Sequence, residues 1–194
     1  MVRTPGSPCR STGEAASVGQ AVAEFALVFP LMLLLVLAVA DFGRLYTSAI
    51  AVEDSAREAA DFGAFSTSYW ATNAGVYNGP ATVELMEERA CVSAAGSHLE
   101  GYVDGPVTAG GHRTCTNPTF TCTLETAGGQ SADCVASGGI VAGTDCSDPT
   151  TEPPCIVHVR MTYVFTLIGA VGPLPQTFEF GRDSRYSISA LPTP

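Results

Sequence analysis

The sequence contains no lysine: all nine basic residues are arginines, and nineteen acidic residues bring the formal net charge to -10. Without a basic patch, the chain has no electrostatic footprint for nucleic acid. The same acidic balance argues against binding of anionic lipid through the charges of a soluble part. We therefore expect no nucleic-acid partner.

The motifs of the common enzyme classes are also missing. The chain has no Gly-x-Ser-x-Gly elbow, no phosphate-binding loop, no zinc-protease helix and no dinucleotide-binding fingerprint. We nominate no catalytic residue and expect no cofactor. The sequence predicts a structural or binding protein rather than an enzyme.

One long apolar run, from Phe25 to Ala40, has Glu24 at its front edge. An ionisable group at the mouth of a membrane helix costs roughly 2.5 to 3.5 kcal/mol on permissive insertion scales, so it is a functional candidate by default. Adding residues 21–23 gives about 20 residues, or about 30 Å of helix, which spans the hydrocarbon core only if Glu24 is included. The sequence therefore predicts a transmembrane segment at about 21–40.

The charges on either side of this segment predict its orientation. Arg3 and Arg10 precede it, and the nearest charge after it is Asp41. Because basic residues remain on the cytoplasmic side, the amino end is expected inside and everything past Asp41 outside. The chain is then a single-pass membrane protein with one modest outer domain.

The seven cysteines fit this orientation. Cys9 lies on the cytoplasmic side, and the other six fall in a compartment where disulfides persist. Six cysteines can pair in fifteen ways, among which the sequence does not choose. They lie in a stretch rich in Gly, Thr, Ser and Pro that needs cross-links to offset its chain entropy. The candidate disulfide cysteines are Cys91, Cys115, Cys122, Cys134, Cys146 and Cys155.

A zinc site is the alternative reading of these cysteines, because His112 lies three residues before Cys115 and His98 lies seven after Cys91. No Cys-x-x-Cys pair occurs, however, and the spacings match no known pattern of zinc ligands. No metal is therefore expected. His158 falls inside a strand pattern.

A stripe of small and medium side chains continues at helical spacing beyond the apolar run, over residues 41–64. A helix from about residue 20 to about 64 would be about 65 Å long, which is more than a membrane requires. Its outer half must pack on the chain's own soluble domain, which we favour, or on other subunits; a filament would use both. Within the run, Pro30 is expected to kink the helix. The stripe comprises Leu45, Ser48, Ala49, Val52, Ala56, Ala59, Ala60 and Gly63.

The remainder of the chain predicts one helix followed by strands. Residues 81–95 have an amphipathic pattern that Gly96 ends, with Val83, Met86, Ala90 and Ala94 facing inward. Strand patterns cover residues 113–124, 156–168, 178–180 and 185–190, and 156–168 is the clearest because its β-branched and aromatic residues alternate.

Helices early and strands late predict an α+β fold with an antiparallel sheet. In this fold a long N-terminal membrane-spanning helix, residues 20–64, continues into a small extracytoplasmic domain, residues 65–194, that disulfides staple together. Residues 1–19 form a separate cytoplasmic leader.

The N-terminal segment resembles the TadE-like proteins of tight-adherence (Flp-type) pilus systems. The resemblance rests on the Glu-Phe-Ala-Leu-x-x-Pro core that begins at Glu24, on the Asp-Phe-Gly that begins at Asp41, and on Ala-Arg-Glu-Ala-Ala at residues 56–60. It covers about the first third of the chain. Residues 96–154 show no family pattern.

This resemblance implies a minor pilin or pseudopilin in the bacterial cytoplasmic membrane, possessing a leader that a prepilin peptidase removes after Gly19. Gln20 would become the new amino terminus and Glu24 the fifth residue. The implied partners are other pilin subunits, the pilus assembly machinery, the peptidase and the membrane. Glu24, Phe25 and Pro30 are the residues expected to set helix register and assembly.

A carboxylate at Glu24 has a physical use in such a bundle. The freed ammonium group at Gln20 of a neighbouring subunit could pair with it, because opposite charges at about 4 Å in a poorly solvated setting attract by several kcal/mol. An unpaired Glu24 would be costly, so the same group would penalise a wrong register.

A different class of function remains open. Residues 38–40 form an acceptable small-x-small cleavage site, so the apolar run could instead be a Sec signal peptide cut after Ala40. The product would be a secreted, disulfide-rich binding domain. Amino-terminal sequencing separates the two interpretations.

Overall fold

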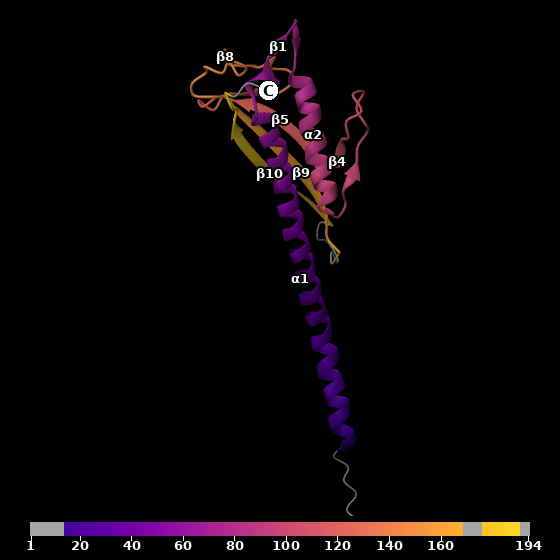
Figure 1. Ribbon diagram of the computed structural model, residues 1–194. Coiled ribbons are helices and arrows are strands. Elements are labelled where there is room, and N and C mark those ends of the chain that lie inside the picture. The colour runs from indigo at the N-terminus through magenta and orange to yellow at the C-terminus, as the bar shows by residue number, and fades with distance from the viewer. Residues whose placement is uncertain (1–13, 169–175, 191–194) are drawn as a thin grey trace, which may run out of the picture.

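A computed structural model describes residues 14–168 and 176–190 of the chain. Its first element is one helix of 51 residues, α1, Glu14–Ala64. Figure 1 shows that the N-terminal half of α1 is a rod that extends well beyond the rest of the molecule. The long N-terminal helix is confirmed, although it begins before residue 20, because the alanine-containing segment 14–18 has no residue that stops a helix.

The elements after α1 are one further helix, a single turn of 3-10 helix and ten strands. In chain order they are η1 Thr67–Trp70, β1 Thr72–Asn73, β2 Val76–Tyr77, α2 Gly79–Gly96, β3 Val103–Asp104, β4 Cys115–Asn117, β5 Thr119–Glu125, β6 Ser131–Asp133, β7 Ile140–Val141, β8 Thr144–Asp145, β9 Ile156–Thr166 and β10 Thr177–Ser187.

The main sheet has four strands in the order β10-β9-β5-β6, and every neighbouring pair is antiparallel. The predicted α+β class with an antiparallel sheet is confirmed. The pattern at residues 113–124 is divided between β4 and β5, because Pro118 has no N–H with which to continue a ladder. The patterns at 178–180 and 185–190 belong to one strand, β10, which ends at Ser187.

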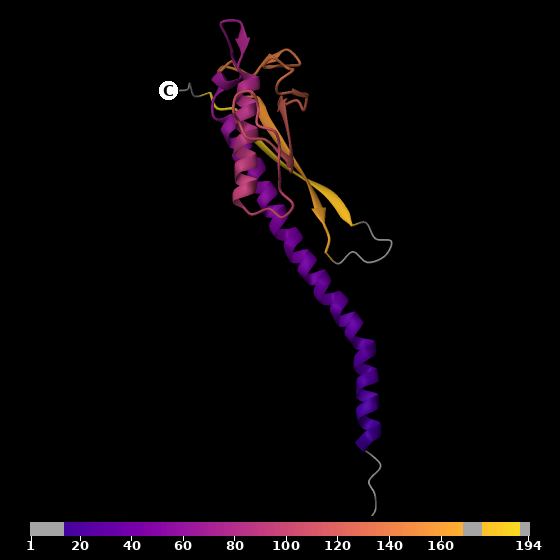
Figure 2. The same ribbon diagram turned by 90° about the vertical axis from the view of Figure 1, so that its right-hand side faces the viewer.

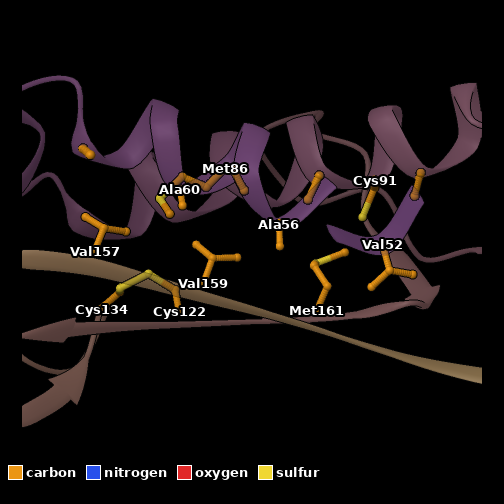
Figure 3. Close-up of a cluster of buried hydrophobic side chains, with 14 of the residues drawn as sticks. Val52, Ala56, Ala60, Met86, Cys91, Cys122, Cys134, Val157, Val159 and Met161 are labelled. Carbon is orange, nitrogen blue, oxygen red and sulfur yellow. A yellow bond between two sulfur atoms is a disulfide. The ribbon is translucent and has the colours of Figure 1, made fainter. Parts of the chain in front are cut away.

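Both helices cover one face of this sheet (Figures 1 and 2). The core lies between the layers, and Figure 3 shows Ala56 and Ala60 of α1 facing Val159 and Met161 of β9. All four side chains are buried. Burial stabilises the fold by roughly 1.5 to 3 kcal/mol for each Val or Met side chain, and the small alanines let the helix lie close to the sheet.

The alternation predicted for β9 is present in the structure. Val157, Val159, Met161, Tyr163 and Phe165 are buried toward the helices, and the residues between them are partly or fully exposed. Helix α2 buries Met86, Ala90 and Ala94 as predicted, whereas Val83 is only partly buried.

The six cysteines that follow α1 lie in three disulfide pairs. Cys91–Cys115 joins α2 to β4, Cys122–Cys134 joins β5 to the turn after β6, and Cys146–Cys155 joins the turn after β8 to the segment before β9. Their Cα–Cα distances are 5.5, 5.6 and 5.4 Å. Each of these distances lies within the usual range for a disulfide.

The carboxyl end of α1 is tied to the domain by hydrogen bonds to carbonyl groups that a helix end leaves without helical partners. The indole Nε1 of Trp70 donates to the carbonyl of Gly63 at 2.9 Å. The backbone N–H of Ser189 donates to the carbonyl of Ala64 at 2.8 Å. These bonds, together with the buried stripe of α1, fix the outer half of the helix to the sheet.

Candidate functional site

The N-terminal half of α1 lies outside the folded domain, and no other described part of the chain covers it. Figure 1 shows this indigo part of α1 standing clear of the sheet and of α2. Its apolar side chains are exposed, among them Phe25, Leu27, Leu31 and Val39. Within the part of the chain that the structure describes, this is the one helix long and apolar enough to cross a membrane. So large an apolar surface needs lipid or other helices to cover it.

Glu24 lies on this exposed rod, four residues after Gln20. The side-chain amide of Gln20 donates a hydrogen bond to Oε1 of Glu24 at 3.0 Å. The two positions therefore share one face of α1, as the spacing of four residues requires. The Gly19–Gln20 peptide bond lies within α1, five residues after its start. Phe25 stacks loosely on Phe29, with ring centroids 5.4 Å apart.

Pro30 is the one proline inside α1. Figure 2 shows that the axis of α1 changes direction in its N-terminal part. Sharp bends in helices almost always occur at proline, because it removes one hydrogen bond and its ring displaces the preceding turn. We attribute the bend to Pro30. The segment of α1 before Pro30 then runs in a different direction from the part of α1 that packs on the domain.

The stripe of small residues in the outer half of α1 packs on the chain's own sheet and on α2. Ala56, Ala59 and Ala60 are fully buried there, and Leu45 is partly buried. Beside this stripe, α1 exposes a second, apolar set at helical spacing: Phe42, Tyr46 and Ile50. Contacts with other subunits would therefore use this second face, which the sequence analysis did not single out.

A polar junction lies where α1 leaves the apolar segment. Asp41 is 8% exposed, and its Oδ1 accepts hydrogen bonds from the backbone N–H of Ile168 at 3.1 Å and from Arg44 at 2.9 Å. Arg44 also pairs with Glu100, and its guanidinium lies 5.2 Å from the ring centroid of Phe165. The junction thus joins α1, the segment after α2 and the end of β9.

Sequence reasoning treated Asp41 as the first charge after the apolar run and as part of the Asp-Phe-Gly motif, and gave it no structural partner. Its partner Ile168, and the Glu100 that pairs with Arg44, are far away in the sequence, so no local spacing could identify them. The hydrogen bond to Glu100 is the main cause that raises the pKa of Arg44 above its ordinary value, and burial opposes it. Arg44 is therefore charged in the folded protein near neutral pH.

Replacing Asp41 with alanine is expected to lower the free energy of unfolding by about 1–3 kcal/mol, because it leaves the Ile168 N–H without this acceptor. Unfolding by urea of the full chain in detergent micelles, followed by Trp70 fluorescence, measures the change. Asp41→Asn keeps an oxygen acceptor and should lose less. Asp54→Ala is the matched control, since Asp54 is exposed and lies 3.7 Å from Arg57; equal losses for Asp41→Ala and Asp54→Ala would contradict the prediction.

Two of the three histidines lie beside carboxylates on the domain. His158 of β9 lies between Glu125 at 2.7 Å and Asp183 at 3.0 Å, on the sheet face that the helices do not cover. His112 contacts Glu88 at 2.7 Å, and this hydrogen bond lowers the pKa of the Glu88 carboxyl. No cluster of three or more metal-ligating side chains occurs among the described residues.

The comparison with protein families agrees with these features of α1. The family model of the TadE-like proteins matches residues 19–61. The resemblance to TadE-like proteins is confirmed. The TadE-like match begins at Gly19 and covers the apolar segment, the junction residues on α1 and most of the buried stripe. It ends before the disulfide-linked part of the chain. Curated proteins and solved structures gave no match.

The TadE-like match supports a protein associated with Tad pili that has an N-terminal helix. That family is structural rather than enzymatic. A membrane-anchored, pilin-like protein is consistent with the single apolar helix.

Proposed function

We propose that this chain is a minor pilin or pseudopilin of a Tad (Flp-type) pilus. The observation that carries the proposal is the exposed apolar rod of α1, which has Glu24 near its start and is rigidly attached to a folded domain at its other end. Such a shape suits a subunit whose helix is covered by lipid before assembly and by other pilin helices afterwards.

Two faces of α1 would have different roles in such a subunit. The small-residue stripe is used inside the chain, where Ala56 and Ala60 lie against the sheet. A second face, with Phe42, Tyr46 and Ile50, remains exposed after the membrane segment. Neighbouring helices can pack on this face without disturbing the domain.

Glu24 would fix the axial position of each subunit. After cleavage behind Gly19, the ammonium of Gln20 on one subunit and the carboxylate of Glu24 on its neighbour would meet in a poorly solvated bundle. The hydrogen bond from the side chain of Gln20 to that of Glu24 within one chain, at 3.0 Å, supports the view that the two residues share one side of α1. A wrong register would leave a buried carboxylate unpaired, which is strongly unfavourable.

The proposal divides the chain into a leader at 1–19, a transmembrane segment at about 21–40 and an outer domain at 65–194 stabilised by disulfides. The amino terminus would lie in the cytoplasm of a bacterium and the domain outside. Prepilin peptidase, other pilin subunits and the assembly machinery would be its partners.

The Sec alternative predicts a cut after Ala40 and release of the domain. In the structure this bond lies inside continuous helix, directly before the junction residue Asp41. Release would separate the domain from the whole exposed rod that the TadE-like match covers.

Amino-terminal sequencing of the protein purified from its native membrane tests the proposal. We expect the mature chain to begin at Gln20, and deletion of the prepilin peptidase should restore a chain that begins at Met1. A chain that begins at Asp41 would establish the secreted alternative. Met1 in cells that contain the peptidase would indicate an uncleaved anchor and contradict the processing step.

A further inference from the structure

The end of β9 lies at the same level along α1 as the exit of the apolar segment. The backbone N–H of Ile168 donates to Oδ1 of Asp41 at 3.1 Å. Asp41 is the first charged residue after the apolar run. Figures 1 and 2 both show the carboxyl end of β9 and the amino end of β10 on the side of the domain that is nearer the N-terminal half of α1. One part of the domain therefore reaches the height at which α1 would leave the hydrocarbon.

The side chains at this height are apolar and exposed. Ile168 is 66% exposed, and on α1 the residues Val39, Phe42 and Tyr46 are 65%, 69% and 62% exposed. Exposed isoleucines are ordinary on a protein surface. Here, however, the backbone of Ile168 is bonded to Asp41, directly after the helix segment whose apolar side chains need lipid. Aromatic residues such as Tyr46 are typical of the membrane–water interface.

We propose that Ile168, at the level of Phe42 and Tyr46 of α1, makes a second membrane contact, in which the segment just after β9 rests in the boundary between the phospholipid headgroups and the acyl chains. This contact rests on the membrane insertion in the proposed function. A single helix leaves the domain free to tilt over the membrane. A second contact to one side of the helix axis fixes that tilt.

The charges nearby allow this contact. Asp41 and Arg44 are paired at 2.9 Å, and Arg44 also pairs with Glu100, so the junction does not present a row of unpaired charges to the lipid. Zwitterionic phospholipid is accordingly a suitable partner. The overall charge of -10 gives no reason to require anionic lipid.

Tryptophan quenching in liposomes tests the proposal on the full chain. Ile168→Trp is the test variant and Phe42→Trp reports insertion of α1. Val164→Trp is the matched control, since Val164 is also exposed and lies on β9, four residues before Ile168 and thus roughly 13 Å away along extended chain. The native Trp70 is a constant background, because its partner Gly63 lies about 33 Å beyond Asp41 along α1.

Each protein is reconstituted in phosphatidylcholine whose acyl chains carry bromine close to the headgroup. We expect Ile168→Trp and Phe42→Trp to lose emission to a similar extent relative to unbrominated lipid. Wild type and Val164→Trp should lose little. Ile168→Trp leaves the hydrogen bond to Asp41 intact, because the donor is the backbone N–H of residue 168. A disulfide map identical to that of wild type verifies the fold of each variant.

The other outcomes separate this inference from the proposed function. Quenching of Phe42→Trp alone would overturn the lipid contact of Ile168 and leave membrane insertion standing. If neither Phe42→Trp nor Ile168→Trp were quenched, both membrane insertion and the second contact would be refuted. A blue-shifted but unquenched Ile168→Trp would place that residue against protein and overturn the proposal. Equal quenching of Val164→Trp would show that the bilayer contact is not confined to the end of the strand, which would also overturn it.

Discussion

Replacement of Glu24 with alanine is expected to reduce assembly into pili to background. An ion pair at about 4 Å contributes about 4 kcal/mol at an effective dielectric constant near 20. Loss of that pairing corresponds to a roughly thousand-fold weaker association of subunits. The measurement is the amount of protein in the sheared surface fraction, together with the number of pili on cells that carry only the variant.

The membrane pool serves as an internal control for this prediction. Removing a carboxylate from the apolar segment makes insertion more favourable, so the amount of membrane-held Glu24→Ala protein should not fall. Glu24→Gln, which keeps the shape without the charge, should fail like Glu24→Ala. Leu27→Ala removes an exposed apolar side chain from the same segment and should assemble nearly normally. Normal assembly of Glu24→Ala would refute the pairing role.

The long helix and the central strand could be predicted because their patterns are local. The alternation in β9 follows from one buried and one exposed sheet face, and the small-residue stripe of α1 follows from close packing on that sheet. The bend in α1 was likewise predictable from Pro30, since its cause lies in the chemistry of a single residue.

The remaining features depend on residues that are distant in the sequence. The junction joins Asp41 to Ile168, and no spacing rule links positions that far apart. The choice among fifteen cysteine pairings requires knowing which strands and helices become neighbours. For the same reason, the sequence identified the buried stripe of α1 and favoured the chain's own domain as its partner, but did not show which strands would bury it, or that Phe42, Tyr46 and Ile50 would remain exposed.

Removal of the Cys91–Cys115 bond is expected to cause the largest loss of domain stability among the three disulfides. Its cysteines are 24 residues apart, whereas those of Cys146–Cys155 are 9 apart. Chain entropy then gives about 3.5 kcal/mol for the first bond and about 2.7 kcal/mol for the second. Cys91 is also fully buried between α2 and the sheet, so Cys91→Ala with Cys115→Ala loses packing as well.

Urea unfolding of the full chain in detergent micelles, followed by Trp70 fluorescence, compares the two double variants with wild type. The Cys91→Ala, Cys115→Ala protein should unfold at the lowest urea concentration, and Cys146→Ala, Cys155→Ala should fall between it and wild type. Cys9→Ser is the control, because Cys9 lies outside the three pairs, and it should unfold like wild type. A non-reducing peptide map that links Cys91 to any cysteine other than Cys115 would contradict both the pairing and the predicted order, because the order of the losses follows from the lengths of the closed loops.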